Sequence, residues 1–337
     1  MSKMTLEDFL GEWNNGSDKL LVHTSGSTGH PKPMWVEKAK MLNSARITCD
    51  FLGLRAGDTA LLCMPLDYIA GKMVVVRAIE RHLRLINEKP SGHPLATPFK
   101  ELKDGEPLTF AAMVPLQVYN TLMVPEERQR LKTIRHLIIG GGAVDKKMSE
   151  ALRDFPNNIW SSYAMTETLS HIALRRVNGP DANDWYTPFD TVDISQAADG
   201  CLVINAPLVH DGILKTNDIV EIRETAVKGM IQKQFRVVGR KDNVINSGGI
   251  KIQIEEVESA LKPFLKAPFA ITKAPEEKFG EEVVLVTEAD DMSEIQEICV
   301  NALPRYWQPR SYLHVDSIPM TETGKPARQQ IEQIARG

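Results

Sequence analysis

The stretch Thr24-Ser25-Gly26-Ser27-Thr28-Gly29-His30-Pro31-Lys32 decides how the rest of the chain is interpreted. Its glycines permit positive φ angles and a close approach of the backbone to a ligand, and successive N–H groups in such a turn form a concave anion site. The hydroxyl groups add donors and Lys32 adds a positive charge. The stretch therefore indicates a phosphate-binding loop, with a polar surface turn as the alternative. It is not a Walker loop, because G-x-x-x-x-G-K-[ST] is absent.

The bulk composition is that of an ordinary soluble globular protein. The 337 residues suggest two or three domains, with 42% hydrophobic and 25% charged residues. A net charge of −4 gives no basic footprint for nucleic acid. The sequence has no apolar run long enough for a transmembrane helix, and its N-terminus lacks the apolar core of a signal peptide. We expect a cytoplasmic protein without nucleic-acid partners or membrane insertion, and the oligomeric state stays open.

The four cysteines favour buried free thiols. Cys49, Cys63, Cys201 and Cys299 are far apart, and no C-x-x-C pair occurs. A zinc site or a disulfide framework is therefore not expected, which fits a reducing compartment.

The first half of the chain predicts a buried, largely parallel sheet. Apolar strands alternate with helical segments after a hairpin formed by residues 20–23 and 34–36. The expected strands are 59–63, 83–86, 109–114, 134–139 and 159–163, and the expected helices are 5–14, 37–53, 70–82, 115–124 and 146–154. Ligands bind at the carboxyl ends of such strands. The glycine run 140–143 and the segment from Tyr163 both lie there.

In the second half of the chain, short predicted strands replace the alternation of strands and helices. Short strands are expected at 201–205, 219–223 and 233–238, followed by the polar break Gly239-Arg240-Lys241-Asp242. Beyond it we expect strands at 250–252, 268–272, 282–287 and 312–315 and helices at 254–263, 293–302 and 326–335. The predicted fold is α/β: a large domain (1–240) with mainly parallel sheets packed by helices and a short-strand β subdomain, joined by a hinge to a small, mobile α+β domain (241–337).

Three further motifs carry polar groups in predicted loops. They are Ser162-Tyr163-Ala164-Met165-Thr166-Glu167-Thr168, Thr216-Asn217-Asp218, and Glu322-Thr323-Gly324-Lys325-Pro326. Taken singly, each also fits a structural turn or a solvated surface charge.

In their order and spacing, these motifs resemble the adenylate-forming superfamily of acyl-CoA synthetases, adenylation domains and luciferases. The carrying pieces are Thr-Ser-Gly-Ser-Thr-Gly-x-Pro-Lys, Gly-Gly-Ala, Tyr-Ala-Met-Thr-Glu, Thr-Asn-Asp, Gly-Arg-Lys-Asp and Gly-Lys-Pro. They span about residues 20–330. The resemblance implies ATP, Mg²⁺ and coenzyme A as cofactors or co-substrates, and a small-molecule carboxylic acid as substrate.

Within that superfamily the chain looks most like the o-succinylbenzoate–CoA ligases of menaquinone biosynthesis. The similar segments are residues 64–71, 111–116 and 162–175. The chain departs from the pattern in two places. Only 23 residues precede the phosphate loop, where relatives usually carry a long N-terminal portion, and Tyr68 replaces the usual His in the acid pocket.

The resemblance assigns most of the nucleotide contacts to the large domain. The ATP-binding residues it implies are Thr24, Ser25, Gly26, Ser27, Thr28, Gly29 and Lys32 at the β- and γ-phosphates, Thr166 at the α-phosphate, Glu167 at Mg²⁺, Tyr163, Gly141, Gly142 and Ala143 around adenine, and Asp218 and Arg240 at the ribose.

The same resemblance places catalysis and domain motion in the small domain. Lys325 is implied to bridge the α-phosphate and the attacking carboxylate, with Thr166 and Glu167 also catalytic. Asp242 is the implied hinge, and Lys251, Gly248 and Gly249 are implied cofactor contacts, the two glycines at the coenzyme A arm.

The acid pocket is the least determined part. Arg77 is a cation within an otherwise apolar segment, where the resemblance places an Arg near a second carboxylate of the acid, with Tyr68 also in the pocket. A structural role for Arg77, at the surface or beside Glu80, is the alternative. For the whole chain, the alternatives are a ligase for another aryl or fatty acid, an enzyme that loads a carrier protein, and a non-catalytic nucleotide-binding relative.

Overall fold

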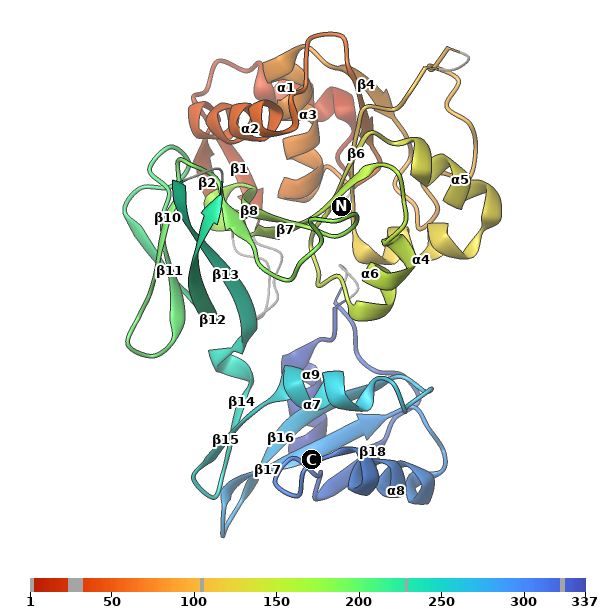
Figure 1. Cartoon of the computed structure of the whole chain (residues 1–337), viewed down its shortest axis with the longest axis vertical. Coiled ribbons are helices and arrows are strands. Elements are labelled where there is room, and N and C mark those ends of the chain that lie inside the picture. The colour runs from red at the N-terminus through yellow and green to blue at the C-terminus, as the bar shows by residue number, and fades with distance from the viewer. Residues whose placement is uncertain (1–2, 24–32, 104–105, 228–229, 322–324) are drawn as a thin grey trace.

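The computed structural model describes residues 3–23, 33–103, 106–227, 230–321 and 325–337. Two lobes are evident in Figure 1, where the larger one contains the chain up to β13 and the smaller one begins at β14. The phosphate loop expected at Thr24, Ser25, Gly26, Ser27, Thr28, Gly29 and Lys32 lies outside the described residues.

A seven-stranded sheet forms the centre of the larger lobe. Its order is β4-β3-β5-β6-β7-β8-β9, with parallel pairing from β4 to β7 and antiparallel pairing from β7 to β9. The strands are β3 (Thr59–Leu62), β4 (Arg84–Asn87), β5 (Phe110–Met113), β6 (His136–Ile139), β7 (Asn158–Ala164), β8 (His171–Arg176) and β9 (Thr187–Pro188). The expectation of a largely parallel sheet is confirmed.

Helices cover both faces of this sheet. On one face α2 (Lys38–Leu52) and α3 (Ile69–Arg81) pack on Ala60, Phe110 and Ile138. On the other, residues of α4 (Pro115–Met123), α5 (Pro125–Thr133) and α6 (Lys146–Leu152) pack on Leu61, Leu137 and Ile139. Burial of both faces explains why these strands are continuous apolar runs.

A close backbone contact fixes the start of α3. A Cβ atom added at Gly71 would lie 2.3 Å from the carbonyl oxygen of Pro65, so only glycine fits. The segment between β3 and α3 therefore folds back tightly, and this sets the position of Tyr68 at the helix N-cap.

The β subdomain is more extended than the sequence predicts. Its four antiparallel strands are β10 (Asp193–Gln196), β11 (Cys201–Asn205), β12 (Ile213–Val227) and β13 (Met230–Arg240). The strands expected at 219–223 and 233–238 are parts of one long β12–β13 ribbon. The outer part of the ribbon extends beyond the core, where Ile231 is 77% exposed. The apolar alternation that predicts a strand from sequence is therefore present only in the inner part.

The N-terminal segment packs as a helix on the larger lobe. Helix α1 (Leu6–Trp13) begins with a capping box between Thr5 and Asp8. It lies near a hairpin of β1 (Lys19–His23) and β2 (Pro33–Glu37). Lys38 donates to the carbonyls of Glu12 (3.0 Å) and Trp13 (2.7 Å), which holds the end of α1. The short N-terminal segment thus has its own packed position.

The smaller lobe is an α+β unit, as expected. Its sheet has the order β15-β14-β17-β16, with β18 parallel to β17. The elements are β14 (Val244–Ser247), β15 (Ile250–Gln253), α7 (Ile254–Leu261), β16 (Phe269–Glu276), β17 (Gly280–Thr287), α8 (Met292–Ala302), β18 (Ser311–His314) and α9 (Arg328–Arg336). Within the described ranges, no helix has the length and apolar character needed to cross a membrane.

We predict that His136 makes the protein acid-sensitive. It is buried at the start of β6, and neither ring nitrogen has a hydrogen-bond partner among the residues that the structure describes. Burial, followed by the charges of Arg135 and Arg176, lowers its pKa to about 4. The pKa of His136 in the unfolded chain is roughly 6.5, so between that pH and about 4 the unfolded chain binds a proton that the folded chain does not bind. The free energy of unfolding therefore decreases as the pH falls through this range.

His136→Phe should therefore flatten the fall in melting temperature between pH 7 and pH 5. His314→Gln, at an exposed histidine, serves as the matched control. An unchanged pH slope in His136→Phe would contradict the assignment.

Candidate functional site

A buried tyrosine and an ion pair form the centre of the site. Tyr163, at the end of β7, donates its hydroxyl to Asp218 Oδ2 at 2.5 Å. Arg240 Nη1 lies 3.3 Å from Asp218 Oδ1, and its Nη2 lies 2.8 Å from Asp242 Oδ2. Asp218 and Arg240 are register partners in the β12–β13 ribbon, which explains why residues 22 positions apart meet.

The protonation of this group follows from its burial. Burial and the Asp218 carboxylate raise the pKa of Tyr163, so the phenol stays a donor. Burial alone lowers the pKa of Arg240, but Asp242 and Asp218 outweigh it and the pKa of Arg240 is raised. The carboxylate of Asp218 keeps lone pairs beyond these two contacts and can accept from a ligand hydroxyl.

The glycine run lies beside Tyr163. It follows β6, which pairs with β7, and Gly140 donates to the carbonyl of Met113 at 3.0 Å. Gly141 has φ +78°, which glycine adopts without strain, and a Cβ at Gly142 would lie 3.2 Å from Pro115. With Ala143, the run therefore forms a narrow backbone surface at the carboxyl ends of β5, β6 and β7.

The predicted Thr166 and Glu167 occupy a single turn after β7. The short helix η1 (Thr166–Thr168) buries Thr166, while Glu167 is partly exposed. His210 Nδ1 lies 3.1 Å from the Glu167 carbonyl oxygen and so fixes this turn. For the Glu167 carboxylate the structure records no hydrogen bond or ion pair with any described residue, which leaves its oxygens available to a cation.

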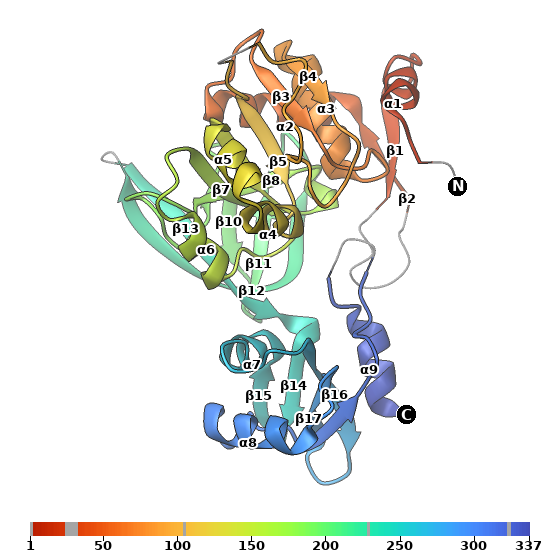
Figure 2. The same ribbon diagram turned by 90° about the vertical axis from the view of Figure 1, so that its right-hand side faces the viewer.

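Lys325 reaches this centre from the smaller lobe. The segment before α9 rises toward the larger lobe in both views (Figures 1 and 2). Burial and the positive charge of Arg240 lower the pKa of Lys325, and the Asp218 carboxylate partly offsets this. The structure therefore brings Lys325 within electrostatic range of Arg240 and Asp218, although it lies 85 and 107 positions away along the chain.

Asp242 lies in the connection between the lobes. It belongs to η2 (Lys241–Asn243), between β13 and β14. On one side of it, Lys241 pairs with Asp199 of the β subdomain at 2.8 Å. A second pair, Lys262–Asp145 at 2.5 Å, joins the end of α7 to the N-cap of α6 and so bridges the lobes.

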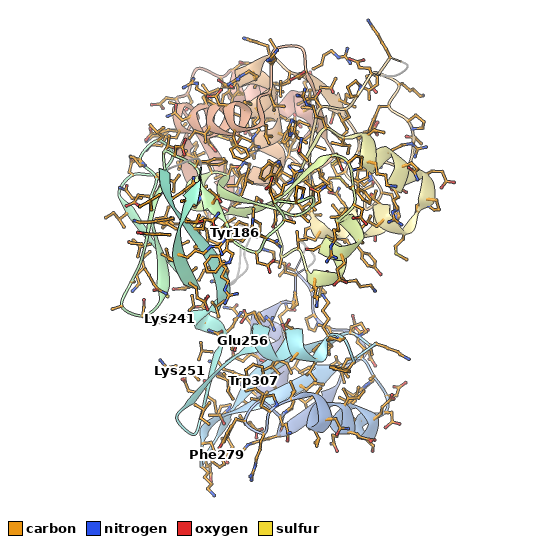
Figure 3. All side chains as sticks on the ribbon, in the orientation of Figure 1. Tyr186, Lys241, Lys251, Glu256, Phe279 and Trp307 are labelled. Atoms are coloured by element: carbon orange, nitrogen blue, oxygen red, sulfur yellow. The ribbon has the colours of Figure 1, made fainter. Side chains whose placement is uncertain are left out.

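Three predicted site residues lie elsewhere. Gly248 and Gly249 form the turn of the β14–β15 hairpin, whose tip points away from the larger lobe (Figure 1). Lys251 is exposed on β15, well below Tyr186 of the larger lobe (Figure 3). In this arrangement of the lobes these residues do not meet the Tyr163–Asp218–Arg240 group.

Arg77 is buried in a cluster without acidic side chains. Only 3% of it is exposed, and its Nη2 donates to Ser170 Oγ (2.7 Å) and Thr48 Oγ1 (3.3 Å). Its Nε has no hydrogen-bond partner in the described part of the chain, and burial lowers the pKa of Arg77 to about 10. The alternative of an ion pair with Glu80 is not observed, because Glu80 pairs with Arg46 and Arg81. Tyr68 is at the opposite end of α3 and is partly exposed.

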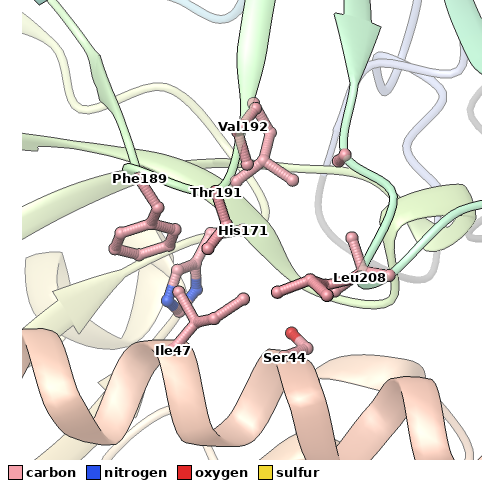
Figure 4. Close-up of a pocket in the computed structure, with 10 residues that line it drawn as sticks. Ser44, Ile47, His171, Phe189, Thr191, Val192 and Leu208 are labelled. Atoms are coloured by element: carbon pink, nitrogen blue, oxygen red, sulfur yellow. The ribbon is translucent and has the colours of Figure 1, made fainter.

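A small pocket adjoins this cluster through His171. This shallow pocket lies between α2, β8 and the segments around residues 190 and 207. In Figure 4, Ile47 and Ser44 project from α2 toward His171, Phe189 and Leu208. The lining is mostly apolar, so the pocket suits a non-polar group.

Sequence reasoning missed Thr48, Ser170, His171 and His210 as site residues. Ser170 and His171 directly follow the Thr166–Glu167 turn, which is a usable signal. Thr48 and His210 carry no motif, and only the packing of α2 and the 206–210 turn brings them to the site.

Comparison with known proteins identifies the family and related chains. The AMP-binding enzyme family matches residues 14–195. A 2-succinylbenzoate–CoA ligase of Listeria monocytogenes is 23% identical over 97% of the chain and 72% of its own length. The long-chain-fatty-acid–CoA ligase FadD13 of Mycobacterium tuberculosis is 26% identical over 92% of the chain and 66% of its own length.

A solved structure has nearly the same extent as this chain. The acyl-CoA synthetase (AMP-forming)/AMP-acid ligase II-like protein of Dyadobacter fermentans is 31% identical, with a TM-score of 0.62. The match covers 96% of this chain and 91% of that one. That structure thus has a similar fold over nearly all of this chain.

Proposed function

The chain belongs to the AMP-binding enzyme family, and we propose that it is an ATP-dependent acid–CoA ligase. It would convert a carboxylic acid to an acyl-adenylate and then transfer the acyl group to coenzyme A. The observation that carries this proposal is the convergence of Tyr163, Asp218 and Arg240 with Lys325 of the other lobe.

The first half-reaction requires charge neutralisation. A carboxylate oxygen attacks the α-phosphorus of ATP, and the bond to the bridging oxygen breaks to release pyrophosphate. Both reactants are anionic, so cations at the reacting centre lower the barrier. Lys325 would bridge the carboxylate and the α-phosphate, and Thr166 would donate to the α-phosphate.

Nucleotide binding would use the buried group and its surroundings. Asp218 accepts from the ribose hydroxyls, and Arg240 holds Asp218 in place while it contacts the ribose. Tyr163 and the surface of Gly141, Gly142 and Ala143 flank adenine. The loop of residues 24–32 would hold the β- and γ-phosphates; this assignment rests on its amino-acid composition.

The donor chemistry at Glu167 fits Mg²⁺. Mg²⁺ is usually bound through one or two carboxylates plus substrate phosphates, and it supplies positive charge to the phosphate oxygens. Glu167 is partly exposed, and its carboxylate has no recorded partner among the described residues.

The second half-reaction would require the lobes to rearrange. The coenzyme A thiol attacks the acyl carbon, the thioester bond forms, and AMP leaves. The Gly248–Gly249 turn and Lys251 would then approach the site by rotation about Asp242, between domains 1–240 and 241–337. Such a rotation about a few residues is a common mode of domain motion.

For the acid we propose o-succinylbenzoate. The support is Arg77, a buried cation without an acidic partner among the described residues. Leaving such a charge unpaired costs several kcal/mol, order of magnitude, and a second substrate carboxylate would relieve it. Ser170, which contacts Arg77, is three positions from Glu167, so the cluster and the proposed reacting centre are neighbours.

One assay distinguishes this proposal from the alternative functions. A panel of aryl diacids, aryl mono-acids and fatty acids is tested for ATP-dependent thioester formation by mass spectrometry, with pyrophosphate and AMP release measured separately. Preference for a fatty acid, adenylation without transfer to coenzyme A, or nucleotide binding without turnover would replace the proposal by another ligase, a carrier-protein loader or a non-catalytic relative.

We predict that Lys325→Ala impairs mainly adenylation. Loss of one electrostatic donor typically lowers the rate by about 10²–10³. Pyrophosphate release should fall by that factor, while thioester formation from supplied acyl-adenylate should be largely retained. Lys266→Ala, at an exposed lysine of the same lobe, is the control. Equal losses in both half-reactions would rule out this role.

We predict that Asp242→Pro separates the two half-reactions. Proline fixes φ near −65°, so rotation about this position should be restricted and one half-reaction should fall much more than the other. Asp242→Ala removes the pair with Arg240 but leaves the backbone free, and it isolates the effect of rigidity. Near wild-type rates in both half-reactions of Asp242→Pro would show that the hinge lies elsewhere.

We predict that Arg77→Leu raises KM for o-succinylbenzoate by roughly 10–100-fold, the worth of hydrogen bonds to a charged group, with little change in KM for ATP. A mono-acid analogue without the second carboxylate should be affected much less. Arg77→Lys keeps the charge and checks that folding is intact. A variant that treats both acids as the wild type does would refute the assignment of Arg77.

A further inference from the structure

Four polar side chains, three of them buried, form a closed hydrogen-bonded ring. Arg77 contacts the hydroxyls of Ser170 and Thr48, and the same two hydroxyls contact the two nitrogens of His171. Thr48 Oγ1 lies 3.0 Å from Nε2, and Ser170 Oγ lies 3.3 Å from Nδ1. Arg77, Thr48 and His171 are buried, whereas Ser170 is partly exposed. Ser170 is therefore the member that a ligand can reach.

The ring permits two arrangements of its protons. Burial and the charge of Arg77 hold the pKa of His171 well below its usual value, so the ring is neutral with one N–H. In the first arrangement Nε2–H donates to Thr48, Thr48 donates to the Ser44 carbonyl at 3.1 Å, and Ser170 donates to Nδ1. Every hydroxyl proton then has a partner within the cluster.

The second arrangement releases a donor. If the proton is on Nδ1, that nitrogen donates to Ser170 Oγ and Nε2 accepts from Thr48. Ser170 Oγ then accepts from both Arg77 and His171, and its own proton is free to donate. Arg77 contributes a further donor, because its buried Nε–H has no partner.

We propose that Ser170 is a second contact for the distal carboxylate of the acid, beside Arg77, and that His171 is the positioning residue whose Nδ1–H tautomer aims the Ser170 proton at it. This inference rests on the proposed ligase function. It specifies the substrate class: a short acid with a second anionic group, held by Arg77 and Ser170 together. Thr48 stabilises the required tautomer by donating to Nε2.

The chemistry of the cluster favours an anion over a neutral group. Among the described residues, the only group that raises the pKa of Arg77 is the buried Cys49, and no carboxylate contributes. A neutral acyl chain would leave both the cation and the Nε–H donor unpaired, which is unfavourable in a buried site. A carboxylate accepts from several donors at once and so completes the cluster.

The first test compares diacid and mono-acid kinetics. Ser170→Ala should raise KM for o-succinylbenzoate about tenfold more than KM for the mono-acid analogue, with kcat changed much less. His171→Phe should lose much of the same preference for the diacid over the mono-acid. His171→Asn, whose amide can replace Nδ1–H, should retain part of that preference. Ser161→Ala removes a buried hydroxyl bonded to Tyr186 and is the matched control. Equal effects on the two acids would overturn the proposal.

The second test does not need turnover. Imidazole nitrogen NMR of ¹⁵N-histidine-labelled protein should show the Nδ1–H tautomer of His171 when o-succinylbenzoate is bound with a non-hydrolysable ATP analogue. Calorimetry should show weaker diacid binding to Ser170→Ala. If the wild type binds the diacid in this way but forms no adenylate, the proposed ligase function is contradicted and the proposed carboxylate site is supported. A bound diacid that leaves His171 with Nε2–H, or no diacid binding at all, overturns the inference.

Discussion

The carboxylate of Asp218 is the group on which the arrangement of the site depends. It accepts from Tyr163, pairs with Arg240, and attracts Lys325 of the other lobe. Arg240 pairs with this carboxylate, and burial and the like charge of Arg240 lower the pKa of Lys325, which the Asp218 carboxylate partly offsets. An incoming phosphate would offset this. In the proposed reaction, an anionic nucleotide would therefore favour a charged Lys325 at this position.

A second buried charge, that of Arg77, lies in the proposed acid pocket. Arg77 is held by neutral hydroxyls and an imidazole, with no carboxylate of the described chain beside it. An arginine already paired with a protein carboxylate would attract a substrate carboxylate much less. In the proposed function, the cost of leaving Arg77 unpaired would favour an acid that brings a second anion.

The contacts between the lobes are suited to a movable arrangement. The Lys262–Asp145 pair has side chains that are 62% and 38% exposed, and exposed ion pairs of this kind contribute about 0–1 kcal/mol. Asp145 also caps α6 through Met148, so its position persists when the pair breaks. The connection at η2 is short and polar, and the Gly248–Gly249 turn lies far from the site. A different lobe arrangement would present that turn instead of Lys325.

The sequence by itself determined the class of fold, the parallel sheet, the α+β lobe and the motifs at strand ends, because burial and turn chemistry act over a few residues. It also singled out Arg77, since a cation in an apolar helix is conspicuous. Only the tertiary structure decided that β12 and β13 form one long ribbon that pairs Asp218 with Arg240, and that Lys325 reaches them. It alone assembled Thr48, Ser170 and His171 around Arg77. These contacts join segments far apart in the chain, and their geometry depends on how helices pack on the sheet, which no local pattern encodes.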